Sequence, residues 1–397
     1  MSEIIEQVLN LPEISVDEVK ISEKKIELKV SSVLCEKRCP KCGKPVDKVH
    51  QLYHRRVRDL SITGREVYLL LEVRQFLCTD CGRHFAEKFN FVRPHSTMTI
   101  RFEKYIYDSC RQADISYVSA KENLCWNTVQ KIFSRFAAQQ RDREKVFSKV
   151  RRPGIDEISL KKGHKDYVAV LVNLDTGEIL DILQDRSKAF LKAYFTEKGS
   201  GFCRQITLFC SDMWEGYLNC AKEVFPDAVI AADRFHFFSV LQDAVDKTRK
   251  AFRKKYPDCA LLKKIKYLLL RNPEDLTGEQ RSQLHKVFSD PRYRDLKLIY
   301  QAKVEFRNVL EKEITKAQAQ MLITEWLEKF AHITNRFYKD FVKFYRTWSD
   351  YILNYFTGRY TTSIIEGINN KLKSIKRRAF GFLNFENFKD RAFVEFS

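Results

Sequence analysis

The order of predicted strands and helices over residues 155–232 constrains the fold of this chain more than any other feature of its sequence. Three strand-like runs come first, followed by a helix, a strand, a helix and a last strand. The predicted strands are Ile155–Leu160, Tyr167–Leu174, Ile179–Gln184, Ile206–Ser211 and Ala228–Ala232, and the predicted helices are Ser187–Lys198 and Glu215–Phe225. Asp175-Thr-Gly177 is a turn signal, so we expect the first three strands to form an antiparallel meander. The segment is therefore predicted to be an α/β layer.

Two aspartates lie on strands that this order makes neighbours. Asp156 is in the first predicted strand, and Asp212 directly follows the fourth. The order βββαβαβ is that of an RNase H-like layer, in which the first and fourth strands are adjacent, so the two carboxylates should converge. Carboxylates this close are costly to ionise without cations between them. Two Mg²⁺ or Mn²⁺ ions, ~3.5–4 Å apart, would meet that need. Taken alone, each aspartate is more simply explained as a helix cap or a solvated turn.

A third carboxylate and an Asp–His pair complete the predicted site. Glu366, in Ser363-Ile-Ile-Glu-Gly-Ile-Asn-Asn370, is the candidate third ligand of the divalent ions. Asp233 and His236 follow the fifth predicted strand and are candidate accessory residues. A histidine at this position could orient a phosphate, a metal-bound water or a neighbouring carboxylate, and a structural hydrogen bond explains it equally well.

The chain between these motifs is expected to be helical. The pattern from about Phe238 to Phe356 is helical throughout, with breaks at Asn272-Pro273 and Asp290-Pro291. Its many aromatic side chains suit a packed core, with assembly or contact with flanking DNA as the alternative. A basic run then follows Glu366 on the same predicted helix and would lie beside any DNA whose phosphate is at the metal ions. Its basic residues are Lys371, Lys373, Lys376, Arg377 and Arg378.

Two Cys-x-x-Cys pairs predict a zinc site near the N-terminus. Cys39, Cys42, Cys78 and Cys81 offer four thiolates from two tight turns, each followed by a glycine. The 35 residues between Cys42 and Cys78 are more than the usual gap, but two strand-like runs, Gln51–Asp59 and Glu66–Phe76, account for them as a hairpin. We therefore predict one structural Zn²⁺ in a β-hairpin finger.

Residues 99–140 have the pattern of a helix-turn-helix. Apolar residues recur at helical spacing, with breaks near Ala113-Asp114 and Asn123–Cys125. An ordinary three-helix packing unit is the alternative. The last helix would expose short polar side chains toward base edges and basic ones toward phosphates. The predicted DNA-contacting residues of this helix are Asn127, Thr128, Gln130, Lys131 and Arg135.

Charge and composition favour a nucleic-acid partner. The chain has 71 Lys and Arg against 52 Asp and Glu, a net charge of +19. Such an excess favours a polyanion, nucleic acid before acidic lipid. No apolar run approaches the ~18 residues of a membrane span, and the acidic N-terminus does not have the order of a signal peptide. We therefore expect a cytoplasmic, nucleoid-associated protein with no membrane partner.

Four segments, taken in order, carry a family resemblance. They are Ile155-Asp-Glu157, Ser211-Asp-Met-Trp-Glu-Gly-Tyr217, Ala232-Asp-Arg-Phe-His-Phe237 and the run Ile365–Phe382. The chain from about Ser32 onward resembles the ISL3 family of bacterial insertion-sequence transposases, whose N-terminal architecture the finger and the helix-turn-helix also match. The resemblance implies a DDE transposase with an RNase H-like core that an all-helical insertion interrupts. It assigns the catalytic triad to Asp156, Asp212 and Glu366, and it matches Asp233-x-x-His236 to an accessory motif.

These observations predict a multidomain α+β protein that transposes DNA. The expected parts are an N-terminal region with the zinc finger (1–97), a helix-turn-helix (98–150), the first part of the RNase H-like core (151–238), an all-helical insertion (239–356) and the last part of the core (357–397). The protein would bind terminal inverted repeats and target DNA, cleave a strand and join it, as a homodimer or larger assembly on DNA. A catalytically silent DNA-binding regulator and an RNase H-like nuclease are the alternatives.

Overall fold

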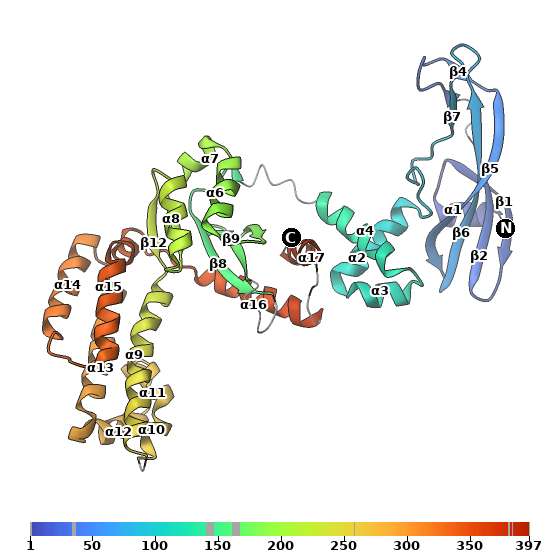
Figure 1. Ribbon diagram of the computed structural model, residues 1–397. Coiled ribbons are helices and arrows are strands. Elements are labelled where there is room, and N and C mark those ends of the chain that lie inside the picture. Colours follow the sequence, from blue (N-terminus) through green and yellow to red (C-terminus); the bar gives the residue numbers. More distant parts are fainter. Residues whose placement is uncertain are drawn as a thin grey trace. The chain divides into compact units, whose positions relative to one another are not determined.

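The computed structural model describes residues 2–33, 37–139, 147–160, 167–257, 259–379, 382 and 384–396. The chain divides into two compact units, an N-terminal unit (Met1–Arg141) and a C-terminal unit (Asp142–Ser397), which we describe separately (Figure 1). The basic composition of residues 141–153 predicts a linker. Its first part, 141–146, lies outside the described residues, whereas Phe147 and Val150 are buried in the core of the C-terminal unit.

A five-stranded sheet forms the first half of the N-terminal unit. Its elements are helix α1 (Ser2–Leu9) and strands β1 (Ile14–Ile21), β2 (Lys25–Ser32), β5 (Val49–Ile62), β6 (Arg65–Leu77) and β7 (His84–Ala86). The strand order is β1-β2-β6-β5, with β7 paired to the end of β6, and β2 and β6 run parallel. The alternation of apolar and polar residues over 21–33 predicts a single strand. That run is instead the end of β1, a turn and β2, because Ser22–Lys24 reverses the chain.

The long β5–β6 hairpin matches the two predicted strand-like runs. Thr63 and Gly64 at its tip both have positive φ, 49° and 79°, which is the backbone of the tight turns that fit the twist of paired strands. At the other end of the hairpin lie two short strands, β3 (Lys37–Arg38) and β4 (Pro45–Val46), which pair with each other. Their small core with Phe76 is separate from the core of the sheet.

Three helices follow the sheet within the same unit. They are α2 (Ile100–Gln112), α3 (Ile115–Lys121) and α4 (Trp126–Gln139), and they end where the sequence predicted breaks. The hydroxyl of Thr99 caps α2 by accepting from the amide of Phe102. Buried ion pairs attach the helices to β5: Arg58 reaches Glu122, and Asp59 accepts from Thr99 and Arg101. The sheet and the helices therefore form one packed body.

The second sheet confirms the predicted RNase H-like layer. Its strands are β8 (Pro153–Ser159), β9 (Tyr167–Asn173), β10 (Ile179–Leu183), β11 (Leu208–Ser211) and β12 (Val229–Ala232). Their order is β10-β9-β8-β11-β12, with the first three strands antiparallel and β8, β11 and β12 parallel. Every residue of β10 and β11 is buried, as expected of strands covered on both faces.

Helices cover both faces of this sheet. On one face pack α6 (Lys188–Glu197), α7 (Ser200–Gln205) and α8 (Glu215–Val224), and on the other α16 (Ser363–Arg378) and α17 (Phe385–Phe396). The sequence did not predict α7 as a separate helix. The C-terminal segment was expected to be helical, and the described part forms α16 and α17.

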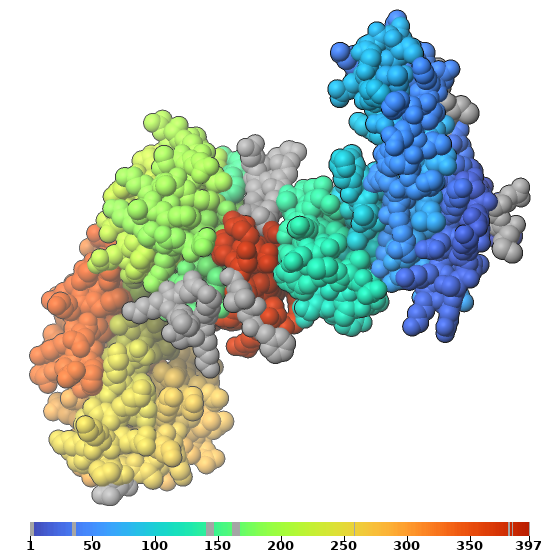
Figure 2. Space-filling model, turned by 45° about the vertical axis from the view of Figure 1, so that its right-hand side comes forward, coloured from blue at the N-terminus to red at the C-terminus, as the bar shows by residue number. Residues whose placement is uncertain are grey.

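An all-helical insertion separates β12 from α16. Its helices are α9 (Arg234–Lys255), α10 (Leu261–Lys264), α11 (Lys266–Leu270), α12 (Gly278–Phe288), α13 (Arg294–Glu311), α14 (Lys316–Lys329) and α15 (Arg336–Asn354), with short 3₁₀ turns η1 (Pro273–Asp275), η2 (Pro291–Tyr293) and η3 (Tyr355–Thr357). Both predicted proline breaks begin 3₁₀ turns. The insertion, yellow to orange, has its own core and forms a lobe beside the green α/β layer (Figure 2). α9 begins directly after β12, so it crosses the predicted boundary at residue 238 without a break.

None of the helices in the described ranges combines the length and the apolar character that crossing a bilayer requires.

Candidate functional site

Strand register brings two of the predicted acids side by side. β8 and β11 are parallel neighbours, and Ser211 lies opposite Ile155. The next residues along the chain are Asp156 on β8 and Asp212 directly after β11, so the two acids lie side by side where β11 ends. This is the adjacency of the first and fourth strands that the sequence predicted.

The third acid comes near these two because α16 packs closely on β8. Glu366 lies in the first turn of α16, next to Ile365, which is buried against the sheet. Gly154 of β8 makes the approach possible, because a Cβ there would lie 2.9 Å from the Cδ1 of Ile365 and 2.6 Å from the Cδ2 of Leu174. A larger residue at position 154 would clash with the side chains of Leu174 and Ile365, so the close packing of α16 on β8 favours glycine here.

One open cavity of about 430 Å³ collects the predicted acids and the accessory pair. It is lined by Asp156, Glu157, Asp212, Asp233, Phe235, His236, Ser239, Thr362, Ser363, Glu366, Asn369 and Lys373. The three predicted triad carboxylates share this cavity. The described residues place no lysine or arginine in an ion pair with any of the three. The cavity therefore presents acids from three distant parts of the chain around open space.

Burial raises the pKa of two of these acids. The pKa of Asp212 is raised to about 6, chiefly by burial, with the charges of Asp156 and Glu157 adding to the shift and the amide of Trp214 and the imidazole of His236 opposing it. Burial also raises the pKa of Asp156, and the charge of Asp233 adds to that shift. Acids that resist ionisation in this way are stabilised as anions when a cation enters the site.

Asp233 is fully buried and joins two elements of the cavity. Its Oδ1 accepts from the amide of Phe235 at 2.6 Å and caps α9, while its Oδ2 accepts from both the amide and the hydroxyl of Thr362 at the start of α16. Asp233 therefore holds the beginning of the helix that carries Glu366. His236, the third residue of α9, lines the cavity and is exposed.

A polar stripe along α16 faces the cavity. Thr362, Glu366, Asn369 and Lys373 all line it at helical spacing. Asn369 is buried and donates from Nδ2 to the Oδ2 of Asp156 at 2.9 Å. Sequence reasoning missed Asn369 and Thr362, although their spacing from Glu366 on one amphipathic helix was a usable signal.

The predicted basic run on α16 divides into two groups. Lys371 donates to the carbonyl of Glu395, Lys376 donates to the carbonyl of Ser159, and Arg378 pairs with the carboxylate of Glu395. Lys373 and Arg377 remain exposed, and Lys373 lines the cavity. Three of the five therefore contact α17 or β8, and the contact of all five with DNA stays a prediction.

The sequence pattern also did not predict the contacts of Glu157, Arg186 and Trp214 beside the acids. The carboxylate of Glu157 pairs with Arg186, whose guanidinium lies 4.9 Å from the ring centroid of Trp214. The ring of Trp214 covers Gly216, where an added Cβ would lie 2.2 Å from the indole. This glycine therefore allows the Trp214 ring to pack beside the acids.

The four cysteines form a compact cluster at the tip of the β5–β6 hairpin. The Sγ atoms of Cys39, Cys42, Cys78 and Cys81 all lie within 4.8 Å of one another, and two of their separations are 3.6 Å. A zinc–sulfur distance of about 2.3 Å gives tetrahedral edges of about 3.8 Å, so the thiols fit one ion. The cluster is separate from the acid cavity and supports a structural zinc.

Local geometry prepares these thiols for a metal. In both turns the glycine after the second cysteine has positive φ, and its amide donates to the carbonyl of the first cysteine at 2.9 Å. Burial acts to raise the pKa of Cys39, but the amides of Cys42 and Lys41 outweigh it and the pKa falls to about 6. A thiolate, the form that binds zinc, is thereby favoured at Cys39. At Cys42 and Cys81 the amides of Lys44 and Arg83 lower the pKa, but burial and the neighbouring thiols outweigh them and the pKa is raised.

The helical trio exposes only part of the predicted recognition surface. Asn127 and Lys131 are exposed on α4, and Thr128 is half-buried. Gln130 was expected at the surface but is buried, with its amide donating to Ser134. The guanidinium of Arg135 lies 2.7 Å from the buried carboxylate of Glu103 on α2. The expectation that Gln130 is exposed was therefore wrong. Arg135 pairs with Glu103 of α2 but keeps part of its side chain exposed, so its contact with DNA stays a prediction.

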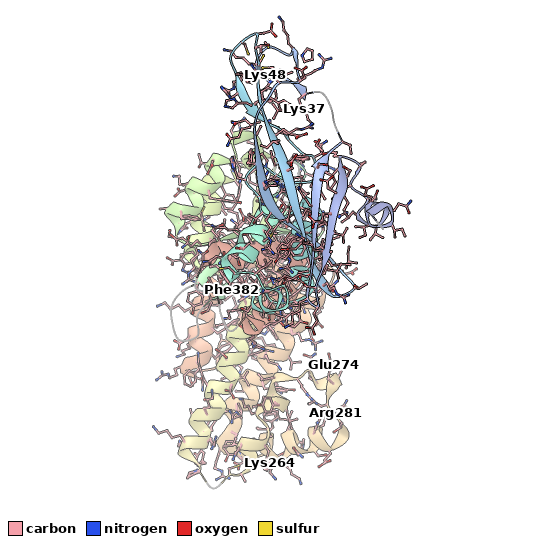
Figure 3. The ribbon with its side chains drawn as sticks, turned by 90° about the vertical axis from the view of Figure 1, so that its right-hand side faces the viewer. Lys37, Lys48, Lys264, Glu274, Arg281 and Phe382 are labelled. Carbon is pink, nitrogen blue, oxygen red and sulfur yellow. The ribbon has the colours of Figure 1, made fainter. Side chains whose placement is uncertain are left out.

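A large basic hollow of about 950 Å³ lies between the zinc tip and the start of α2 in the N-terminal unit. Its charged lining includes Lys37, Arg38, Arg55, Arg83, Lys88 and Arg93, with Glu87 as the acid. Glu87 is neutralised by Arg74 and by Lys37, which is labelled near the tip with Lys48 (Figure 3). The hollow therefore presents net positive charge beside the helices.

Comparison with known proteins agrees with this arrangement. Residues 154–392 match a family model of ISL3 DDE type described as "Transposase", residues 36–81 match the zinc-finger of transposase IS204/IS1001/IS1096/IS1165, and residues 87–137 match the helix-turn-helix domain of transposase family ISL3. The transposase for insertion sequence element IS1001 of Bordetella parapertussis is 27% identical over 88% of this chain and 86% of its own length. The transposase for element IS1557 of Mycobacterium tuberculosis is 27% identical over 87% of this chain and 82% of its own length.

Proposed function

This chain belongs to the ISL3 family of transposases, and from that premise we propose that it binds the terminal inverted repeats of its own insertion sequence, cleaves one strand and joins the freed 3′ end to target DNA. The observation that carries the proposal is the convergence of Asp156, Asp212 and Glu366 on one cavity. We further propose that two copies act together on DNA, since two element ends must be held at once, and that they do so on the bacterial chromosome in the cytoplasm.

The donor set of the cavity fits divalent cations. Carboxylate oxygens are the ligands that Mg²⁺ prefers, and the raised pKa values of Asp156 and Asp212 indicate anions that lack a counter-charge. All three carboxylates line the same open cavity, which leaves room between them for two ions ~3.5–4 Å apart.

In this proposal Asp156, Asp212 and Glu366 hold two Mg²⁺ or Mn²⁺ ions. When bound, such ions activate the attacking oxygen and neutralise charge on the leaving oxygen. Asn369 holds Asp156 through the bond to its Oδ2, which leaves the carboxylate in one orientation. Asp233 and Thr362 fix the start of α16 and hence the position of Glu366.

The remaining cavity residues would manage the substrate. The exposed ammonium of Lys373 would contact a phosphate that enters the cavity, and His236 would orient that phosphate or the attacking water. Lys131 and Asn127 on α4, together with the basic hollow of the N-terminal unit, would bind the element end. Catalysis would then rest on positioning and on cation charge.

A cleavage assay on a labelled element end tests the proposal. Asp156→Asn, Asp212→Asn and Glu366→Gln each keep the size of the side chain and remove one charge. Each should lower Mg²⁺-dependent cleavage by at least ~10³-fold, since several kcal/mol of transition-state stabilisation disappear. End binding should persist, because the N-terminal unit is unchanged.

Asp175→Asn and Asp185→Asn are controls for this assay. Asp175 pairs with Arg152, and Asp185 accepts hydrogen bonds from Ser187, so neither should affect the chemistry. If Glu366→Gln cleaves like the wild type while an acid within 305–328 proves essential, the third ligand is wrong. A wild-type chain that binds ends and never cleaves would favour the regulator alternative.

A further inference from the structure

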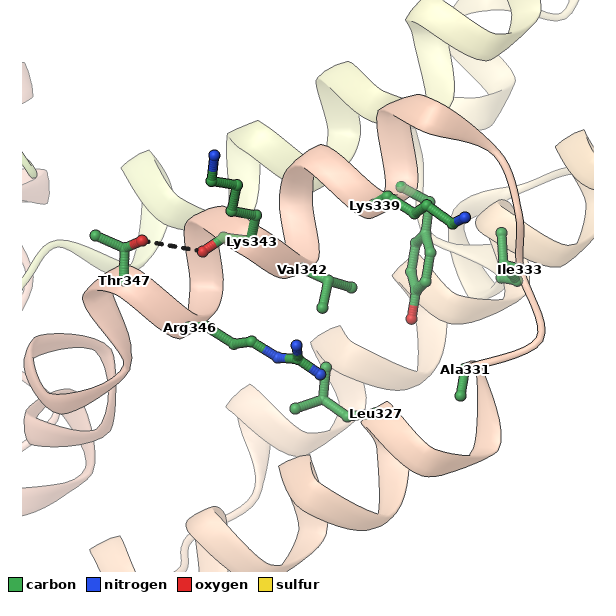
Figure 4. A pocket seen from close by; sticks show the side chains of 9 residues that line it. Leu327, Ala331, Ile333, Lys339, Val342, Lys343, Arg346 and Thr347 are labelled. Atoms are coloured by element: carbon green, nitrogen blue, oxygen red, sulfur yellow. Dashed lines mark hydrogen bonds between the residues drawn. The ribbon is translucent and has the colours of Figure 1, made fainter.

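The helical insertion has a basic hollow of its own, of about 520 Å³, between the end of α14 and one face of α15. Lys339, Lys343 and Arg346 of α15 line it, and Leu327, Ala331 and Val342 form its apolar floor. In Figure 4, Arg346 extends across the hollow toward Leu327 and Lys339 extends toward Ile333, while Lys343 points away from Leu327. Small side chains in the floor and long basic ones at the border give the surface its concave shape.

The three cations are exposed, and none of them forms an ion pair with a described residue. Helix stability does not account for them. Cations stabilise a helix near its C-terminus, whereas these lie in the first two-thirds of α15, a helix with no acid in its first turn. The side chain of Tyr338 also lines the hollow, and its buried hydroxyl lacks a hydrogen-bond partner in the described structure. The three basic side chains and the Tyr338 hydroxyl are therefore hydrogen-bond donors without an acceptor among the described residues.

The spacing of the cations matches a nucleic-acid strand. They recur at i, i+4 and i+7, which places them on one helix face over about 10.5 Å. Successive phosphates of one DNA strand advance about 3.4 Å along the duplex axis, so the row spans about three nucleotide steps. The insertion as a whole is basic, with 24 Lys and Arg against 15 Asp and Glu in residues 239–356, net +9.

α15 also connects this row to the catalytic sheet. The side chain of Asn354, at the end of α15, donates to the carbonyl of Ile230 on β12 at 2.9 Å, and Trp348 and Tyr351 pack against the core of the sheet. Arg346 lies about 12 Å along the helix from Asn354. DNA held by this row would therefore be fixed relative to β12 and to Asp233 beyond it.

We propose that Lys339, Lys343 and Arg346 form a phosphate-binding row through which the insertion grips the backbone of the duplex whose end lies in the acid cavity. The inference rests on the proposed function, and it adds a second DNA surface that lies outside the zinc finger, the helix-turn-helix and the acid cavity. An acidic protein surface is the competing occupant, and the test below separates the two.

The test measures how binding of the full-length protein depends on salt. The probe is a duplex that carries one element end and its flanking donor DNA. In K339A/K343A/R346A the plot of log K against log salt should be less steep by up to about 2.7, because each lost phosphate contact removes about 0.9. Ethylation interference on the same probe should lose a contiguous group of phosphates in this variant.

Two further variants make the result specific. K263A/K264A/R281A removes the same number of positive charges from α10 and α12, outside the hollow; Lys264 and Arg281 are labelled in Figure 3. It should keep the wild-type slope and footprint. K339R/K343R/R346K keeps the charges in place and should also behave like the wild type, which covers the case in which the alanine variant folds poorly.

Three outcomes would overturn the inference. In the first, the slope of K339A/K343A/R346A equals that of the wild type. In the second, both alanine variants lose slope equally, which means that only total charge matters. In the third, K339A/K343A/R346A changes self-association in the absence of DNA while the salt dependence of its DNA binding stays the same, which indicates a protein partner. A wild-type protein that neither binds nor cleaves its ends would refute the proposed function itself, whereas an active wild type with an unmoved slope refutes only the row.

Discussion

The buried carboxylates of the N-terminal unit and the half-buried acids of the candidate site in the C-terminal unit differ in their partners. In the N-terminal unit the buried carboxylates have cationic partners: Glu103 contacts Arg93 and Arg135, and Glu87 contacts Arg74. In the C-terminal unit Asp156 and Asp212 line an open cavity with raised pKa values and no arginine or lysine paired to them within the described residues. Removing one partner of a buried pair is costly, so paired charges serve the fold. Unpaired ones mark the place where an external cation would act.

The largest expected effect concerns the zinc cluster, which would neutralise four thiolates in the N-terminal unit. Cys39→Ser or removal of zinc by a chelator should unfold the tip that contains β3, β4 and β7, because zinc binding in such sites is worth on the order of 10 kcal/mol. The sheet and the helices should stay folded, since their cores are separate from the cysteine cluster. Metal analysis should find about one zinc per chain.

Hydrogen exchange measures the extent of this unfolding. After chelation, amides in 37–50 and 76–86 should lose protection while those of α2 and α4 keep it. A tip that remains protected without metal would contradict the zinc assignment, and loss of protection throughout the unit would mean that the tip and the sheet fold together.

The next effect tests a buried cation of the C-terminal unit. Lys303 on α13 is buried and donates to the carbonyls of Leu269 and Arg271, and its pKa is lowered to about 8 by burial and by the charge of Arg307. An unfolded lysine titrates near 10.4, so between these values the unfolded chain binds more protons than the folded one. Stability of the insertion should therefore rise by up to ~3 kcal/mol as pH increases from about 8 to about 10.

Urea unfolding across that pH window checks the prediction. Lys303→Met should remove the rise, and Lys297→Met, an exposed position on the same helix, should retain it. The described part of the N-terminal unit contains no buried lysine, so its transition should not show this dependence. Equal slopes in the wild type and Lys303→Met would contradict the assignment to Lys303.

A smaller effect is expected where the C-terminal unit positions its acids. Asp233→Asn replaces the acceptor that holds Thr362, so Glu366 should lose its fixed position and cleavage should fall about 10- to 100-fold, as for groups that orient metal ligands. Thr362→Val should produce a similar loss, and Thr362→Ser, which keeps the hydroxyl, should not. His236→Ala should also impair cleavage less than a triad variant. A loss as complete as that of Asp156→Asn would place Asp233 among the metal ligands.

The smallest effects separate two cations of α4 that are four residues apart. Arg135→Ala leaves the buried Glu103 with Arg93, so it should destabilise the N-terminal unit by about 1–3 kcal/mol. Lys131→Ala removes an exposed charge, so stability should be unchanged and the salt slope of end binding should fall by about 0.9. Thermal melts and a salt titration of both variants measure the contrast. A stable Arg135→Ala variant with a reduced slope would restore Arg135 to the DNA surface.

The sequence by itself determined the features that depend on neighbours along the chain. Hydrophobic period predicted the strands of the second sheet and the three helices after Thr99, because alternation and helical spacing are local consequences of burying one face. The cysteine pairs predicted their own cluster, since each turn needs only four residues and a glycine. The order of elements also predicted that β8 and β11 are adjacent, which is a rule of topology.

Only the tertiary structure decided which polar residues are available for function. Gln130 and Arg135 have the spacing of a recognition surface, yet the first is buried and the second pairs with Glu103 of α2. Asn369 and Thr362 appear ordinary in the sequence, and they become part of the cavity because Gly154 lets α16 approach β8. The physical reason is the same in each case: a side chain's partners come from elements far away in the sequence, and local pattern carries no record of them.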